Sequence, residues 1–247
     1  MKKTILLLFI AVVTLNCKNE KREVKNEETV TKENVAKNID NYWEILFDGT
    51  STDSWRGYMV DSIFPEWTIE NGALTFTPFK EGGKNIITKK KYTNFILSLE
   101  WKISEGGNSG IFWSVFEDPK FSEAYQTGPE IQVLDNERHP DAKIAGKLHQ
   151  AGALYDMIEP SEDVVKPAGE WNLCILKVDH NENLGSVTMN GVEIVTFPLH
   201  GEAWEKMIEN SKFKGWDGFG EHATGHIGLQ DHGDKVWFKN IKIKELK

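Results

Sequence analysis

The stretch Trp67–Phe76, "WTIENGALTF", carries the pattern that decides the fold class. Two short runs rich in apolar and β-branched residues flank Asn71-Gly72. An Asn-Gly pair in this position favours a β-hairpin, because both residues tolerate the positive φ of a tight turn. The segment Ser186–Phe197 has the same pattern around Asn190-Gly191. The sequence therefore predicts antiparallel strands that follow one another along the chain.

Other segments have the length and composition of strands, and one has the spacing of a helix. In Glu202–Asn210, Trp204 and Ile208 lie four residues apart, which predicts a short amphipathic helix on the surface. Many short strands with a single helix indicate an all-β antiparallel sandwich or barrel. The remaining strands are expected at Phe95–Ile103, Gly110–Phe116, Glu130–Leu134, Trp171–Asp179, Gly225–Gln230 and Val236–Leu246.

Composition limits the classes of function. The chain has 247 residues, of which 39% are hydrophobic, so it can bury a sizeable core. Its formal net charge of -9 and its scattered lysines argue against nucleic acid as a partner, because such proteins present a basic patch to phosphates.

The amino terminus predicts export. Lys2 and Lys3 precede an apolar run from Ile5 to Val13, and the segment that ends at Cys17 resembles a bacterial lipoprotein signal. We therefore expect a signal peptide at 1–17, a disordered polar tether at 18–40 and a folded domain at 41–247. A lipid on Cys17 would attach the protein to a membrane of the cell envelope, in the periplasm or at the outer membrane; simple secretion is the alternative.

Only Cys174 would remain after removal of the signal and modification of Cys17. It lies in the apolar run Leu173–Leu176, which predicts a buried structural thiol and leaves no internal disulfide.

Polar residues alternate with apolar ones on two of the predicted strands. Glu130 and Gln132 alternate with Ile131 and Val133, and His226 and Gln230 are expected on one face of the strand at 225–230. Such a polar face is either solvated surface or the wall of a site, and alternation alone leaves both interpretations open.

A series of motifs in fixed order resembles the 3-keto-disaccharide hydrolase family. The resemblance covers Tyr42 to Leu246 and implies a jelly-roll β-sandwich of the concanavalin A-like lectin/glucanase type, with a concave sugar-binding face. The motifs are "GNSGIFW" (107–113), "GPEIQVLDN" (128–136), "GALYD" (152–156), "GEWN" (169–172), "NGV" (190–192), "SKF" (211–213) and "GHIGLQDHGDKVWFKNIKIKEL" (225–246). Ser114 and Lys239 stand where arginine is common in this family, and the first difference suggests another sugar preference.

The resemblance also implies a reaction. A ketone at carbon 3 acidifies the hydrogen at carbon 2, so a base, an acid and an electrophilic group could eliminate the glycosidic oxygen, and water would then add. We expect Glu130, His149 and His232 to be catalytic. The residues expected to bind substrate are Asn108, Gln132, Asp135, Tyr155, Gln230 and Asp231.

Each assignment has a structural alternative. Asp135 and His232 lie where turn residues are common, a lone histidine such as His149 is more often structural than catalytic, and Trp113 alternates with core positions. A packed tyrosine at 155 with one satisfied hydroxyl is as plausible as a proton donor.

Cofactors and partners follow from what the motifs contain. A divalent metal is possible, yet no compact ligand motif is present, and no glycine-rich strand-to-helix motif indicates a nucleotide cofactor. The expected substrate is an oligosaccharide or glycoside that a separate sugar 3-dehydrogenase has oxidised. The alternatives are a non-catalytic carbohydrate-binding module and a conventional glycosidase with paired carboxylates.

Overall fold

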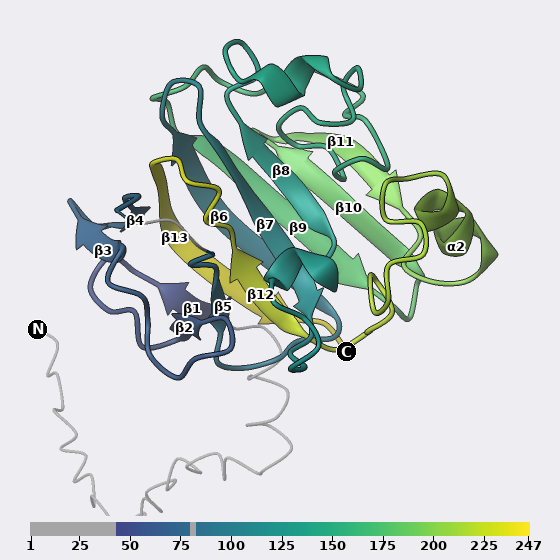
Figure 1. The fold of residues 1–247 in the computed structure, drawn as a ribbon, viewed down its shortest axis with the longest axis horizontal. Helices are drawn as coiled ribbons and strands as arrows, with labels where there is room; N and C mark the ends of the chain where they lie inside the picture. The colour runs from purple at the N-terminus through teal and green to yellow at the C-terminus, as the bar shows by residue number, and fades with distance from the viewer. Residues whose placement is uncertain (1–42, 80–82) are drawn as a thin grey trace, which may run out of the picture.

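The computed structural model describes residues 43–79 and 83–247, which form two antiparallel sheets packed face to face (Figure 1). The predicted signal peptide, the tether and Cys17 lie outside the described residues. Within them, no helix is both long enough and apolar enough to span a bilayer.

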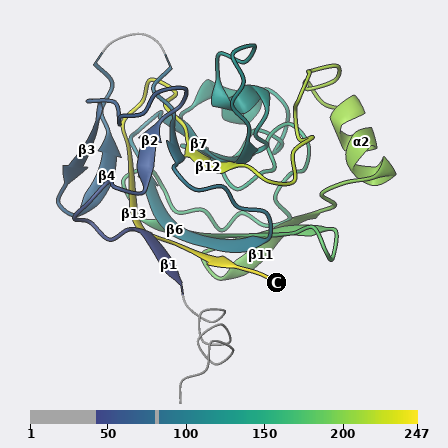
Figure 2. The same cartoon turned by 90° about the horizontal axis from the view of Figure 1, so that it is seen from below.

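The larger sheet has eight strands. Seven of them follow the order β11-β10-β9-β6-β13-β4-β3, and the eighth, β1, pairs with β13 outside this order. Figure 2 shows this sheet as a curved layer beneath β7 and β12. In chain order its strands are β1 (Glu44–Phe47), β3 (Trp67–Glu70), β4 (Ala73–Phe76), β6 (Phe95–Ile103), β9 (Asn172–Asp179), β10 (Leu184–Met189), β11 (Val192–Phe197) and β13 (Val236–Glu245).

The smaller sheet has five strands in the order β2-β5-β12-β7-β8. Its strands are β2 (Trp55–Gly57), β5 (Ile86–Thr88), β7 (Asn108–Val115), β8 (Glu130–Leu134) and β12 (His226–Leu229). The short strands β1, β2 and β5 were not predicted, because three or four residues are too few to establish alternation.

Both predicted hairpins are confirmed. Asn71 and Gly72 have φ values of 51° and 74° between β3 and β4, and Asn190 and Gly191 have 51° and 90° between β10 and β11. Residues with side chains other than Asn or Asp rarely adopt such angles, so these pairs fix the register of each hairpin.

The core lies between the sheets and is rich in aromatic residues. Trp101 and Phe238 of the larger sheet and Trp113 of the smaller sheet belong to this cluster, and the Trp113 ring lies 5.4 Å from that of Phe197. Trp113 is therefore a core residue, and Cys174 is buried as predicted. The all-β antiparallel sandwich is confirmed.

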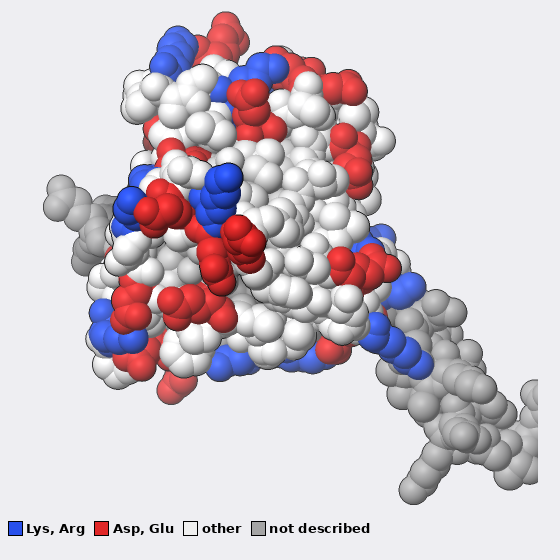
Figure 3. Space-filling model, turned by 90° about the vertical axis from the view of Figure 1, so that its right-hand side faces the viewer, with Lys and Arg blue, Asp and Glu red and all other residues white. Residues whose placement is uncertain are grey.

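Helical segments lie outside the sheets. The predicted surface helix is α2 (Glu202–Glu209), which buries only Trp204. Two 3-10 helices, η1 (Ala124–Gln126) and η2 (Pro140–Lys143), precede and follow β8. On the side of the molecule where α2 lies, acidic and basic side chains are interspersed around a broad uncharged area (Figure 3).

Burial of β8 differs from the prediction. Alternation predicted a half-buried strand, whereas all five residues of β8 are buried. The segment Gly152–Tyr155 pairs with the edge of β8, since Gly152 N donates to Gln132 O and Tyr155 N donates to Glu130 O. This pairing covers the edge of β8 that faces away from β7.

Candidate active site

A cavity of about 420 Å³ lies on the polar side of the smaller sheet, and we call it the Glu130 cavity. The side chains that face it alternate with core residues Ile131 and Val133, so the cavity and the core occupy opposite faces of β8. Most of the predicted site residues line it, namely Asn108, Glu130, Gln132, Tyr155, Gln230, Asp231 and His232.

Strand pairing brings these residues together. Gly110 of β7 lies opposite Gln132 of β8, and Gln230 N donates to Gly110 O, which continues the pairing beyond the end of β12. A Cβ atom at Gly110 would overlap Glu130 Oε1. Glycine at this position therefore provides the space that the carboxyl group occupies.

Glu130 has an unusual electrostatic environment. Its side chain is almost fully buried, at 8% exposure, and burial raises its pKa to about 8; the charge of Asp141 adds to this rise, while Lys212 and a hydrogen bond from Gln230 oppose it. A carboxyl group that exchanges its proton near neutral pH is suited to general acid–base chemistry.

Two amide oxygens beside Glu130 lack partners. Asn108 Oδ1 and Gln230 Oε1 are buried and accept no hydrogen bond from any described residue. A buried acceptor without a donor costs about 1–3 kcal/mol, so these atoms suit the hydroxyl groups of a bound ligand.

Tyr155 is held by a network behind the cavity wall. Its hydroxyl donates to Asp141 Oδ2 at 2.9 Å, and its ring stacks on His149 at 4.4 Å between centroids. Burial, followed by this hydrogen bond to Asp141, raises the pKa of Tyr155. The phenol therefore stays protonated at neutral pH and its proton is engaged by Asp141, which favours the packed tyrosine with a satisfied hydroxyl over the proton donor. Tyr155 still lines the cavity, so its prediction as a substrate contact stays open.

His149 does not line the cavity. Its Nδ1 lies 2.8 Å from Asp141 Oδ1 and its Nε2 lies 2.8 Å from Asp156 Oδ1. Both ring nitrogens are thus occupied by carboxylates, which leaves no nitrogen to face a substrate. The geometry assigns His149 to the positioning of Tyr155; a direct catalytic role stays a prediction without support here.

Asp135 also lies away from the cavity. Its carboxylate accepts hydrogen bonds from the backbone of Gly106, Glu137 and Arg138, at 2.7 to 3.3 Å. Burial by itself raises the pKa of Asp135, but these hydrogen bonds outweigh it and hold the pKa below its usual value. The side chain caps a turn, so its prediction as a substrate contact is not supported.

The turn after β12 contributes two predicted residues with different environments. Asp231 accepts hydrogen bonds from Lys84 N at 3.0 Å and from Gly233 N at 2.7 Å, so each of its carboxylate oxygens already accepts one hydrogen bond from the protein backbone. His232 is exposed at the rim of the cavity, with its ring 6.3 Å from that of His139. His232 is therefore free to approach a ligand from the open side.

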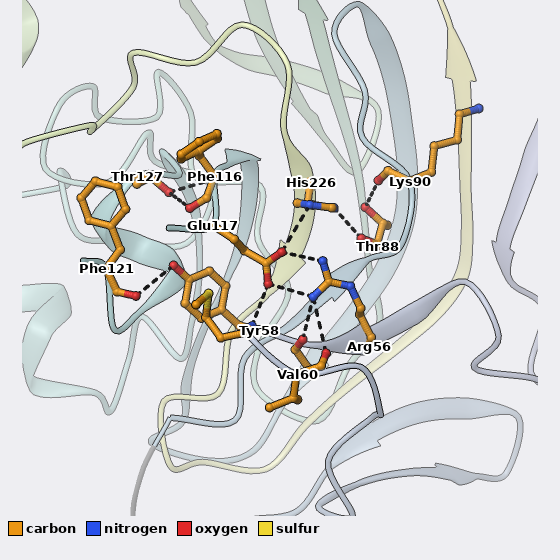
Figure 4. A network of polar contacts seen from close by, with 12 residues as sticks. Arg56, Tyr58, Val60, Thr88, Lys90, Phe116, Glu117, Phe121, Thr127 and His226 are labelled. Carbon is orange, nitrogen blue, oxygen red and sulfur yellow. Dashed lines mark hydrogen bonds and ion pairs between the residues drawn. The ribbon is translucent and has the colours of Figure 1, made fainter. Parts of the chain in front are cut away.

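His226 lies in a separate network. Alternation predicted that it shares a face with Gln230, opposite Ile227 and Leu229, and these two apolar residues do lie in the core. The neighbouring strand β7 has a β-bulge opposite this end of β12, where the register shifts and Ser114 has a φ of 55°. His226 Nδ1 lies 2.6 Å from Thr88 O, and its Nε2 lies 3.7 Å from Glu117, as Figure 4 shows. The extra residue of the bulge belongs to β7, so the alternation of β12 is kept and His226 meets its own network at the end of the strand away from Gln230 and the cavity.

The two positions that depart from the family pattern lie away from the cavity. Ser114 sits in the bulge, and Lys239 on β13 pairs with Glu100 at 3.3 Å. Neither residue lines the Glu130 cavity. The suggestion that Ser114 alters sugar preference therefore has no support in a direct contact.

Sequence reasoning missed several cavity residues because they lie in loops without periodicity. Lys212 Nζ lies 4.0 Å from the centre of the Tyr155 ring, and Lys212 N donates to Asp156 Oδ2. Glu123 accepts from Asn85 Nδ2 at 2.8 Å; burial, reinforced by Asp231, raises its pKa. The "SKF" motif at 211–213 was the one signal that could have identified Lys212.

No three His, Cys, Asp or Glu side chains within residues 43–79 and 83–247 are arranged to hold a metal ion. The possible divalent metal thus has no ligand set among them, and no step below depends on one.

The fold and the cavity define a β-sandwich protein with a polar, ligand-sized site on its smaller sheet. The family model described as a 3-keto-alpha-glucoside-1,2-lyase-like domain matches residues 42–244, and the chain belongs to this family.

Relatives with known names or structures agree with this assignment. A 3-keto-disaccharide hydrolase from Bacteroides thetaiotaomicron is 37% identical over 228 residues, which span 81% of this chain and 77% of the relative. A crystal structure from Parabacteroides distasonis, assigned as a glycosyl hydrolase, has a TM-score of 0.76 and 30% identity, covering 88% of this chain and 98% of the other. A second one from that organism has a TM-score of 0.65 and 29% identity, with coverages of 83% and 100%. These relatives support a glycoside hydrolase activity for this chain.

Proposed function

We propose that the protein cleaves 3-keto-glycosides, including 3-keto-disaccharides, by elimination followed by addition of water. The observation that carries the proposal is the buried carboxyl group of Glu130, which has a pKa of about 8. It lies in the same cavity as Lys212 and two unpaired amide oxygens. The description of the family and the name of the Bacteroides relative support the choice of substrate.

The first step is removal of a proton. Ionised Glu130 takes the hydrogen from carbon 2, and the electron pair moves to the oxygen at carbon 3 as an enolate. Lys212, whose side chain lines the cavity, stabilises this oxygen by its charge. Buried Asn108 and Gln230 accept hydroxyl hydrogens of the sugar through their unpaired oxygens and hold carbon 2 against Glu130.

The second step breaks the glycosidic bond. The enolate electrons form a double bond between carbons 1 and 2, and the oxygen on carbon 1 leaves with a proton. His232 at the rim is the group in position to supply that proton, since Tyr155 already donates to Asp141. Water then adds its hydroxyl group to carbon 1 and gives its remaining proton to His232, while Glu130 returns its proton to carbon 2, so the net reaction is hydrolysis.

Product analysis by NMR tests this function. The purified protein is incubated in D₂O with 3-keto-trehalose or with trehalose, with and without a chelator. We expect free sugars from the keto form alone, with solvent deuterium at carbon 2 of the keto product beyond that in an enzyme-free control. A sugar 3-dehydrogenase is the class of enzyme that would supply such a substrate.

One observation favours a second candidate, conventional glycoside hydrolysis. Glu123 and Glu130 line the same cavity, and both have raised pKa values, so a pair of carboxyl groups is available. Cleavage of unoxidised trehalose without deuterium at carbon 2 would establish this candidate. Binding without turnover of either sugar would indicate a carbohydrate-binding module.

A further inference from the structure

Two partly exposed aromatic side chains stand where the Glu130 cavity opens. Tyr125 is 39% exposed and Trp216 is 37% exposed, and their ring centroids lie 6.1 Å apart. Both line the Glu130 cavity, and both also line a second hollow of about 490 Å³, which we call the outer hollow. The two rings therefore form a boundary that the cavity and the outer hollow share.

Trp216 is held in place by other aromatic residues. Its ring meets Phe213 edge-on at 5.2 Å and Phe219 edge-on at 6.4 Å, and those two rings stack on each other at 3.8 Å. Trp216 N also donates to Phe213 O. This packing fixes the ring although more than a third of it faces solvent.

Tyr125 is fixed by η1. Glu123 N donates to Gln126 Oε1 at 2.9 Å, which closes a capping box around this short helix. The ring of Tyr125 thus comes from a segment ordered by its own hydrogen bonds. Two aromatic side chains from distant segments are both held at the mouth, which is the pre-organisation that a binding surface requires.

The outer hollow combines these rings with a polar edge. Lys120 Nζ lies 2.6 Å from Asp217 Oδ2, and these two residues line the hollow with Gln126 and Phe121. A sugar ring has an apolar face of C–H groups and a rim of hydroxyl groups. Aromatic faces suit the first and charged or amide side chains suit the second.

We propose that the outer hollow binds the leaving-group sugar of a disaccharide while the keto sugar occupies the Glu130 cavity. This inference rests on the proposed function, because it assigns the two rings of one substrate to the two compartments. The glycosidic oxygen then lies at the boundary formed by Tyr125 and Trp216. Binding energy from the second ring serves to position carbon 2 over Glu130, so a substrate without that ring reacts more slowly.

The test compares substrates with and without the second sugar. Wild-type protein and the variants Trp216→Ala, Trp216→Phe and Tyr125→Ala are assayed with 3-keto-trehalose and with methyl 3-keto-α-glucoside. For Trp216→Ala we expect kcat/KM to fall about 10-fold to 100-fold with the disaccharide and less than about 3-fold with the methyl glycoside. Trp216→Phe keeps an aromatic face and should retain most of the activity.

Trp43 offers a matched control. It is 36% exposed and packs beneath Lys242 of the larger sheet, so Trp43→Ala removes an equally exposed ring far along the chain from the cavity. We expect it to leave both rates unchanged. Equal losses on both substrates in Trp216→Ala and Tyr125→Ala would overturn the proposal, as would the absence of any loss.

Binding separates a failure of this proposal from a failure of the proposed function. Affinities of unoxidised trehalose and glucose for the wild-type protein and Trp216→Ala are measured by calorimetry. If no keto substrate is turned over, the proposed function fails; the outer hollow still stands if Trp216→Ala weakens trehalose binding about 10-fold and leaves glucose binding unchanged. Equal affinities of both proteins for trehalose would overturn it.

Discussion

Glu117 follows one strand of the smaller sheet and Glu130 begins the next strand, yet the two carboxyl groups have opposite environments. Glu117 follows β7 and forms two hydrogen bonds with the guanidinium of Arg56, at 2.8 and 2.5 Å, and a third with Met59 N (Figure 4). Burial alone raises the pKa of Glu117, but these hydrogen bonds, Arg56 first, hold it below the usual value. Glu130 has no ion pair within the part of the chain that the structure describes, and burial raises its pKa to about 8.

This difference indicates that the Glu117 carboxylate stabilises the structure, whereas the Glu130 carboxyl group is suited to chemistry. Every oxygen of Glu117 has a donor, so its charge joins the loop after β2 to the end of β7. Glu130 lies beside two amide oxygens that lack donors, which is costly unless a ligand completes the site. Groups with strongly shifted pKa values in a cavity are concentrated at functional sites for this reason.

The largest effect is expected for Glu130→Gln. The amide has nearly the same shape but cannot take a proton, so kcat with 3-keto-trehalose should fall about 1,000-fold. Steady-state kinetics measure this loss, and the fold should remain intact by circular dichroism. A fall of less than about 10-fold would mean that another group is the base.

Gly110→Ala tests the space reserved for that carboxyl group. The added Cβ overlaps Glu130 Oε1, so Glu130 must move, and we expect kcat to fall about 100-fold. The side chain at this position faces the cavity and not the core, so the melting temperature should fall far less than activity does. Full activity in this variant would show that the position of Glu130 is unimportant.

Arg56→Met removes the partner of Glu117. A partly buried carboxylate then loses its ion pair, and the free energy of unfolding should fall by about 2 kcal/mol, less than for a fully buried pair. Urea denaturation measures this change, and kcat should remain within about 3-fold of wild type. A large loss of activity with unchanged stability would reverse the roles of the two glutamates.

The pH dependence of stability gives the most direct contrast between the two glutamates. The folded state favours protonated Glu130, so wild type should lose stability relative to Glu130→Gln as pH rises from the usual glutamate pKa of 4.5 to about 8. Glu117 has a lowered pKa, so wild type should lose stability relative to Glu117→Gln as pH falls below 4.5.

Urea midpoints measured across this range test both signs. For each glutamate, the free energy of unfolding of wild type relative to its Gln variant should change across this range by more than about 1 kcal/mol if the pKa shift of that glutamate exceeds about one unit. Parallel curves for wild type and Glu130→Gln would mean that Glu130 titrates normally, and the contrast with Glu117 would disappear.

The fold was more predictable than the site because its signals are local. Asn-Gly turns and alternating strands specify hairpins within about ten residues, and both hairpins were found. Alternation also placed Glu130 and Gln132 on the face opposite the core. It could not show that His226 contacts Glu117 and Thr88 and not the cavity, because the neighbours of each strand end come from distant segments.

The sequence by itself determined the sandwich, the family and most of the polar residues that face the cavity. Tertiary structure alone decided that His149 supports Tyr155 and that Asp135 caps a turn. It also brought Lys212, Glu123 and Trp216 to the cavity. Secondary structure follows periods of a few residues along the chain, whereas burial, pairing and pKa depend on groups from distant segments, which meet only when the two sheets and their loops have packed.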